Sequence, residues 1–260
     1  MSETEISWLG LAASLVLVAA AIALSAWHRL GLGRDMAWAS ARALVQLLVV
    51  GYALVVVVDD DAPIALAWLW VVLMVPFAAW TVRRRAPEVP GAFSLSLVST
   101  GAGAAVSLGV IFGLGIFDMT GRTVVPLAGM MIGNAMKDAV VAGRRIVEEM
   151  ADKRPEVEAR LALGQPWPEA SRPHVRAAMR TALISQIETT KAVGLVFLPG
   201  AMTGLILAGV DPLDAVRVQA AIMFLILGAV ATNVIVIGRG LTRRLFTPDH
   251  RLVELRRAAG

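Results

Sequence analysis

Polar residues inside long apolar runs are the positions of this chain whose types could do chemistry. Arg42 and Gln46 lie four residues apart, so they share one face of a helix. Glu188 and Lys191 are three apart and can pair across one helical turn. Polar groups in hydrocarbon are costly and normally face a bundle interior or a water path. These residues indicate a solute path or its gate. Plainer interpretations are a snorkelling Arg42, an interhelical hydrogen bond from Gln46 and a surface ion pair.

A second polar group follows a GxxxG step formed by Gly129 and Gly133, which permits close helix approach. Asn134 then lies either at a tight interface with one hydrogen bond or on the path. Lys137 and Asp138 are adjacent and do not share a face, and we expect them where the helix leaves the membrane.

A Pro-Gly step at Pro199 and Gly200 predicts a kinked or broken span, and transporters place such breaks at substrate paths. Together these patterns give one set of candidate path or gate residues: Arg42, Gln46, Asn134, Glu188, Lys191, Pro199, Met202, Thr203 and Gln219.

No catalytic constellation is visible, so an enzyme is not expected. His28, His174 and His250 lie in separate segments, and the chain has no cysteine. It also has no GxxxxGK[ST] phosphate loop and no GxGxxG motif, so we expect no bound nucleotide or other cofactor. A metal site is left unassigned.

The elements that must position these residues are membrane helices, because 57% of the 260 residues are hydrophobic and they gather in long runs. The acidic residues 1–5 lack the basic region of a signal peptide, so the first run is expected to persist as a span. We predict an all-α polytopic bundle as a single domain, residues 1–260, with seven spans near residues 8–27, 37–58, 64–82, 92–117, 124–141, 190–210 and 215–237.

The basic residues orient this bundle. Nineteen of the 24 lysines and arginines fall in alternate connections and the tail, on one predicted side. The positive-inside rule then places the N-terminus outside and the C-terminus in the cytoplasm. Basic residues beside apolar runs suit the lipid bilayer and its headgroups, so nucleic acid is not an expected partner.

The one long charged segment, residues 143–185, predicts a helix, a sharp turn and a second helix on the cytoplasmic side. Pro155 suits a first turn and Gly164 can end the helix. Glu158, Ala159 and Gly164 match part of the Glu-Ala-Ala-x-x-x-Gly pattern with which importer-type permeases contact their ATPase.

Longer motifs in order make the chain similar to the FetB-type ABC permeases, which include bacterial iron exporters and plant aluminium-tolerance permeases. The motifs are Arg42-Ala-Leu-Val-Gln46, Pro126-Leu-Ala-Gly129-Met-Met-Ile-Gly133-Asn134, Leu161-Ala-Leu163-Gly164, Lys191-Ala-Val-Gly194 with Leu198-Pro199-Gly200-Ala-Met202-Thr203-Gly204, and Asp211-Pro212-Leu.

This resemblance implies a multi-pass permease of the cell membrane, acting as a homodimer with two copies of a separate ATP-binding subunit. ATP and Mg²⁺ would be bound by that partner, and Glu158, Ala159, Leu163 and Gly164 would contact it. Export of a metal ion, with iron as one candidate, or of another small solute is implied. The competing hypothesis is an ion-coupled secondary transporter or channel that needs no ATPase.

Overall fold

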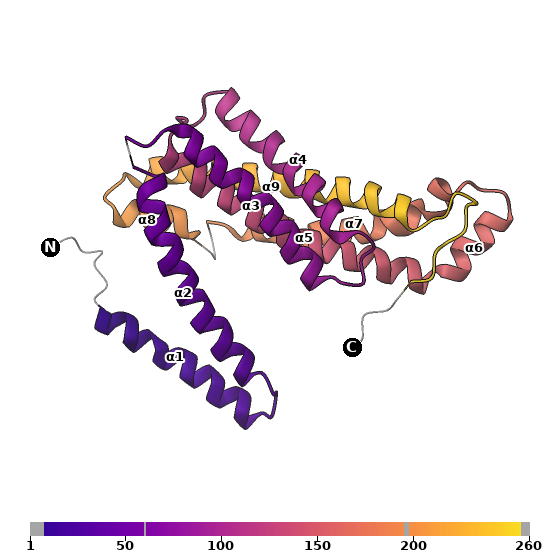
Figure 1. Ribbon diagram of the computed structural model, residues 1–260, viewed down its shortest axis with the longest axis horizontal. Coiled ribbons are helices and arrows are strands. Elements are labelled where there is room, and N and C mark those ends of the chain that lie inside the picture. Colours follow the sequence, from indigo (N-terminus) through magenta and orange to yellow (C-terminus); the bar gives the residue numbers. More distant parts are fainter. Residues whose placement is uncertain (1–7, 60, 195–197, 256–260) are drawn as a thin grey trace.

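The computed structural model describes residues 8–59, 61–194 and 198–255, and its regular elements are helices (Figure 1). Residues 1–5, Asp60 and part of the 190–210 run lie outside the described residues, as do Arg256 and Arg257. The helices are α1 (Trp8–Trp27), α2 (Gly33–Val57), α3 (Ile64–Arg85), α4 (Ala92–Gly113), α5 (Gly121–Asp152), α6 (Arg154–Ala162), α7 (Trp167–Ala192), α8 (Gly200–Leu207) and α9 (Pro212–Arg244).

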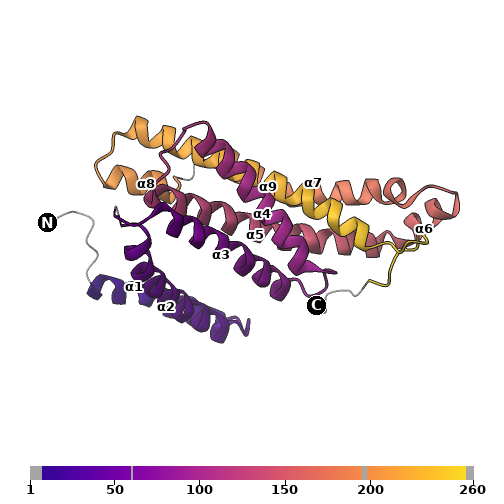
Figure 2. The same cartoon turned by 45° about the horizontal axis from the view of Figure 1, so that its top comes forward.

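A bundle of α3, α4, α5, α7 and α9 runs along the long axis of the molecule, with α8 at one end and α6 at the other (Figure 2). Helix α9 packs against α4, α5 and α7. Small residues let α4 and α9 approach closely: a Cβ added at Gly103 would lie 2.8 Å from the carbonyl oxygen of Ala229. The core is accordingly built on short side chains such as Ala128 and Ala142, both fully buried.

The α1–α2 hairpin stands apart from this bundle, and its side chains are mostly exposed although they are apolar (Figure 1). Such a surface is stable when hydrocarbon covers it. Six described helices, α1 to α5 and α9, are long and apolar enough to cross a membrane. The all-α polytopic prediction is therefore confirmed.

Two predicted spans have different bounds in the structure. The run at 124–141 belongs to the longer α5, because buried Ala139, Ala142, Ile146 and Met150 keep helical spacing beyond the charged pair Lys137-Asp138. Those two residues thus lie within α5, short of its end. The predicted span at 190–210 is no continuous helix: α7 ends at Ala192, and α8 begins at Gly200.

The break at Pro199 and Gly200 agrees with the predicted interruption. Helix α7 returns along the bundle from the α6 end, and α8 lies at the opposite end (Figure 2). A seventh crossing would therefore consist of α7 and α8 together, and the total of seven spans and their orientation stay predictions.

Candidate transport path and coupling element

The helix–turn–helix between α5 and α7 forms as predicted. Pro155 lies in the first turn of α6, and Gly164 has φ +87°, a left-handed conformation that glycine adopts without strain. The amide of Gln165 donates to the carbonyl of Arg160 at 3.1 Å, which closes the last turn. The turn then leads directly into α7 at Trp167.

One side of α6 is fixed to the bundle and the other is free. Val157 is fully buried, and Leu161 packs one turn later on the same face. Glu158 and Ala159 point outward, and Leu163 is 84% exposed at the tip. The predicted coupling residues therefore share a protruding, rigidly held surface at one end of the molecule.

The chain after α9 holds this element in place, which the sequence did not lead us to expect. We call residues 245–255 the C-terminal strap. Arg154 of α6 donates hydrogen bonds to the carbonyls of Leu252 and Val253, at 3.2 and 3.4 Å. The ring of Trp167 stacks on Phe246 with centroids 5.4 Å apart. The apolar residues of an otherwise basic tail were the signal that could have indicated this packing.

A buried histidine joins the three helices at the same end. His174 of α7 has its Nδ1 3.7 Å from a carboxylate oxygen of Glu149 on α5, and its Nε2 3.7 Å from one of Glu156 on α6. The side chain is buried, and Nε2 has no hydrogen-bond partner within the described residues. His174 was read from sequence only as an isolated histidine, because its two neighbours come from other helices.

This contact also sets the register between α5 and α7, which run antiparallel (Figure 2). About four helical turns from His174 and Glu149, the same register brings Glu188 level with Ala135. Helix α9 meets this level too, since Asn233 donates from Nδ2 to the carbonyl of Ala135 at 2.5 Å. Asn134, Glu188 and Asn233 therefore lie at one depth, which we call the polar level.

The residues of the polar level differ in exposure. Asn233 is fully buried, whereas Asn134 is half-buried and donates to the carbonyl of Met130 in its own helix at 2.7 Å. Glu188 and Lys191 pair at 2.9 Å, with side chains 61% and 67% exposed. Charged groups of this kind are costly in hydrocarbon and are stable when they face water or another protein surface.

The glycines of the GxxxG step do not make the expected close approach within this chain. A Cβ added at Gly133 would meet nothing within 4 Å, and one at Gly129 would make an ordinary contact with Met74. Close approach between helix backbones is seen instead between α4 and α9, at Gly103 and Ala229.

Helix α8 is anchored through its first turn. Gln219, buried in α9, accepts a hydrogen bond from the amide of Met202 at 3.2 Å. Thr203 donates from its hydroxyl to the carbonyl of Pro199 at 3.2 Å. The structure thus brings Pro199, Met202, Thr203 and Gln219 together at the α8 end of the bundle.

Arg42 and Gln46 are not part of either group. Both are exposed on α2, in the hairpin that stands away from the bundle, and the interhelical hydrogen bond expected for Gln46 does not form among the described residues. Nor does the described part of the chain hold a cluster of three or more His, Asp or Glu side chains that could bind a metal ion.

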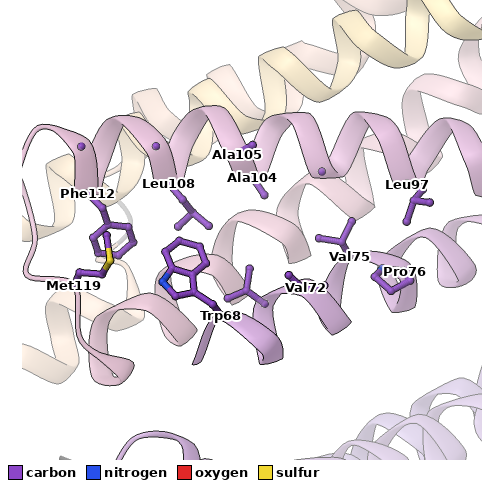
Figure 3. Close-up of a pocket in the computed structure, with 14 residues that line it drawn as sticks. Trp68, Val72, Val75, Pro76, Leu97, Ala104, Ala105, Leu108, Phe112 and Met119 are labelled. Carbon is purple, nitrogen blue, oxygen red and sulfur yellow. The ribbon is translucent and has the colours of Figure 1, made fainter. Parts of the chain in front are cut away.

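A large groove between α3 and α4 is apolar throughout, with a volume of about 910 Å³ (Figure 3). Trp68 and Phe112 meet edge-on at one end of it, with ring centroids 6.1 Å apart, and Val75 and Pro76 lie toward the other. Its lining offers hydrocarbon surface and no charged ligand, so it suits an acyl chain or an apolar helix face and not a metal ion.

Comparison with known proteins matches residues 8–246 to the family described as "Uncharacterised protein family (UPF0014)". The "Probable iron export permease protein FetB" of Escherichia coli (strain K12) is 33% identical over 255 residues, 97% of each chain. The rice (Oryza sativa subsp. japonica) "UPF0014 membrane protein STAR2" is 40% identical over 219 residues, 84% of this chain and 76% of that one. "Protein ALUMINUM SENSITIVE 3" of Arabidopsis thaliana is 34% identical over 224 residues, 85% of this chain and 81% of that one. No solved structure matches the chain. Because the family model matches residues 8–246, the chain belongs to the UPF0014 family. Together with the long apolar helices described above, this shows a multi-pass membrane protein.

Proposed function

We propose that this chain is the non-catalytic permease subunit of an ABC transporter, driven by a separate ATP-binding subunit that docks on α6. The observation that carries the proposal is Leu163, exposed at the tip of a helix whose other side is fixed by buried Val157. An exposed apolar side chain on a rigid protrusion suits insertion into a groove on a partner. ATP and Mg²⁺ would bind to that partner.

The proposed direction and solute are supported by the printed name of one relative. FetB of E. coli carries the name of an iron export permease, and it aligns along nearly the whole of this chain. We extend that activity to this protein as export of a metal ion or another small solute, with iron as the first candidate. In this proposal the α6 end faces the cytoplasm, because arginines cluster there at the ends of α3 and α5.

The polar level supports a path that two copies of the chain complete. Glu188 and Lys191 lie on the exposed side of α7, at the depth of Asn134 in α5. Charged groups at this depth are stable when they face water or another protein surface. A homodimer that covers this side of α7 would place the pair beside the solute path, and α8 would move with the break at Pro199.

Co-expression with an ATPase that carries a phosphate loop and no membrane spans tests the docking. The wild-type chain is expected to retain the ATPase through purification and to transport Fe²⁺ in liposomes only with ATP. Leu163→Ser is expected to weaken ATPase retention by about tenfold, as for a central apolar contact. Leu207→Ser is the matched control, because Leu207 is also exposed but lies in α8 at the opposite end.

A second substitution tests the shape of the turn. Gly164→Val places a β-branched residue at φ +87° and is expected to uncouple ATP hydrolysis from transport. Equal ATPase retention by Leu163→Ser and Leu207→Ser would refute the docking site. Transport of Fe²⁺ by the chain alone, without ATPase, would instead establish a secondary transporter or channel.

A further inference from the structure

Four arginines line one groove between α7 and α9, near the α6 end of the bundle. Arg172 and Arg176 lie one helical turn apart on α7, and Arg239 and Arg243 do the same on α9. The groove has a volume of about 520 Å³. Two arginines from each of two neighbouring helices thus line the same groove.

This positive charge is not balanced by the residues that the structure describes. Among the described residues, no carboxylate lines the groove and none forms an ion pair with any of the four arginines. Glu169, one turn before Arg172 on α7, is not among the lining residues. Like charges in close array repel one another, and an anion bound between them relieves this repulsion.

The groove lies at the depth where lipid headgroups are expected. The apolar part of α9 ends at Ile237, and Arg239 is the first charged residue after it. At this boundary the two helices are in tight contact, since a Cβ added at Gly238 would lie 2.2 Å from the sulfur of Met179. The charged groove therefore opens directly below the closed, apolar part of the α7–α9 interface.

The other lining groups suit the glycerol and upper acyl region of a lipid. Val175, Met179, Trp167 and Pro168 give part of the groove an apolar lining. Tryptophan is enriched at the membrane–water boundary, where an apolar ring meets polar headgroups. An inorganic anion would use the arginines alone, whereas a phospholipid would use both the arginines and this apolar lining.

We propose that this groove is a binding site for the phosphate group of an anionic phospholipid. Guanidinium groups bind phosphate oxygens through paired hydrogen bonds, and basic pockets between membrane helices at the cytoplasmic side suit such headgroups. The site is separate from the polar level and from α6. Because Trp167 also stacks on Phe246, a lipid in the groove would contact the residue that joins α7 to the C-terminal strap.

Native mass spectrometry of the detergent-purified chain tests the site without the ATPase. Phosphatidylglycerol is added in one sample and zwitterionic phosphatidylcholine in another, and retained lipid is measured. Wild-type protein is expected to retain phosphatidylglycerol in preference to phosphatidylcholine. The variant Arg239→Gln/Arg243→Gln is expected to lose about tenfold in retention, because two charge-assisted contacts are removed.

The charge-matched control is Arg83→Gln/Arg84→Gln, which removes two arginines from the last turn of α3 and leaves the groove intact. It should retain phosphatidylglycerol like the wild type. Equal retention by both double variants, or equal retention of the two lipids by the wild type, would overturn the proposal. Thermal stabilisation by inorganic phosphate without retained phosphatidylglycerol would also overturn it, because the ligand would then be a free anion.

Discussion

The guanidinium group of Arg154 donates a hydrogen bond to the carbonyl oxygen of Leu252 at 3.2 Å, and this contact joins α6 to the chain beyond α9. The same side chain pairs with Glu158 at 2.7 Å. Arg154 therefore makes one contact within α6 and another between α6 and the C-terminal strap. A movement of α9 would reach α6 through the strap as well as through α7. Coupling between the bundle and a docked ATPase would then use two connections.

Arg154→Met tests the connection through the strap. The methionine keeps an apolar stem but removes the donors to Leu252 and Val253, so α6 should open more readily. Hydrogen exchange of the α6 amides is expected to speed up by about tenfold, since a charged hydrogen bond contributes roughly 1.5 kcal/mol or more. Mass spectrometry after timed deuterium labelling measures this change.

Arg160→Met is the matched control, because Arg160 lies on the same helix and, among the described residues, its side chain pairs with Glu156 alone, four residues before it. A partly exposed pair of this kind contributes about 0.3–0.5 kcal/mol, so exchange should change little. Equal exchange rates in the two variants would show that the strap does not stabilise α6.

Local signals predicted much of the fold. Apolar runs predicted α1 to α4 to within four residues at each end, and they predicted α9 without its last seven residues. Pro155 and Gly164 predicted α6 because caps act within a single turn. Hydropathy ended the fifth run at residue 141, soon after Lys137 and Asp138, whereas α5 extends to Asp152. The helix continues there because its buried face, including Ile146 and Met150, packs on neighbours that the sequence does not reveal.

The candidate site was harder to predict because it depends on register between distant segments. The pairing of Glu188 with Lys191 followed from their spacing. The strap contact of Arg154 and the placement of His174 between two glutamates did not, since each joins separate elements. Arg42 and Gln46 share a helix face as predicted, but spacing within α2 could not show that this helix stands away from the bundle.

Asn233 is predicted to stabilise the α5–α9 contact. Asn233→Ala removes the hydrogen bond to Ala135 from a fully buried position, and interhelical bonds of this kind in membranes contribute about 0.6 kcal/mol on average and up to about 1.7. The free energy of unfolding in mixed micelles should fall by at least that amount, because a small cavity is also left. Asn134→Ala, which loses only a bond within its own helix, should change it less. The reverse order would contradict this role of Asn233.

Gly103 is predicted to be a glycine that the α4–α9 contact requires. In Gly103→Ala the new Cβ would lie 2.8 Å from the Ala229 carbonyl, so α4 and α9 must separate, at a cost of roughly 1–3 kcal/mol. Gly133→Ala meets open space and should be neutral or slightly stabilising, as alanine favours helix. Thermal unfolding of the two variants in detergent distinguishes these outcomes. A melting temperature of Gly133→Ala below that of the wild type would contradict the prediction and indicate that a second copy packs against Gly133.

The ion pair of Glu188 and Lys191 is predicted to affect transport and not stability. Glu188→Gln breaks an exposed pair, so the free energy of unfolding should change by about 0–1 kcal/mol. If the pair lies beside the solute path, Fe²⁺ transport by the complex with its ATPase should fall by about tenfold, a loss of about 1.4 kcal/mol in transition-state stabilisation.

The matched control is Asp214→Asn at the start of α9. It breaks an exposed ion pair between Asp214 and Arg217, which has the same three-residue spacing and the same length of 2.9 Å. Because that pair lies away from the polar level, transport should persist. Equal transport by the two variants would exclude Glu188 from the path.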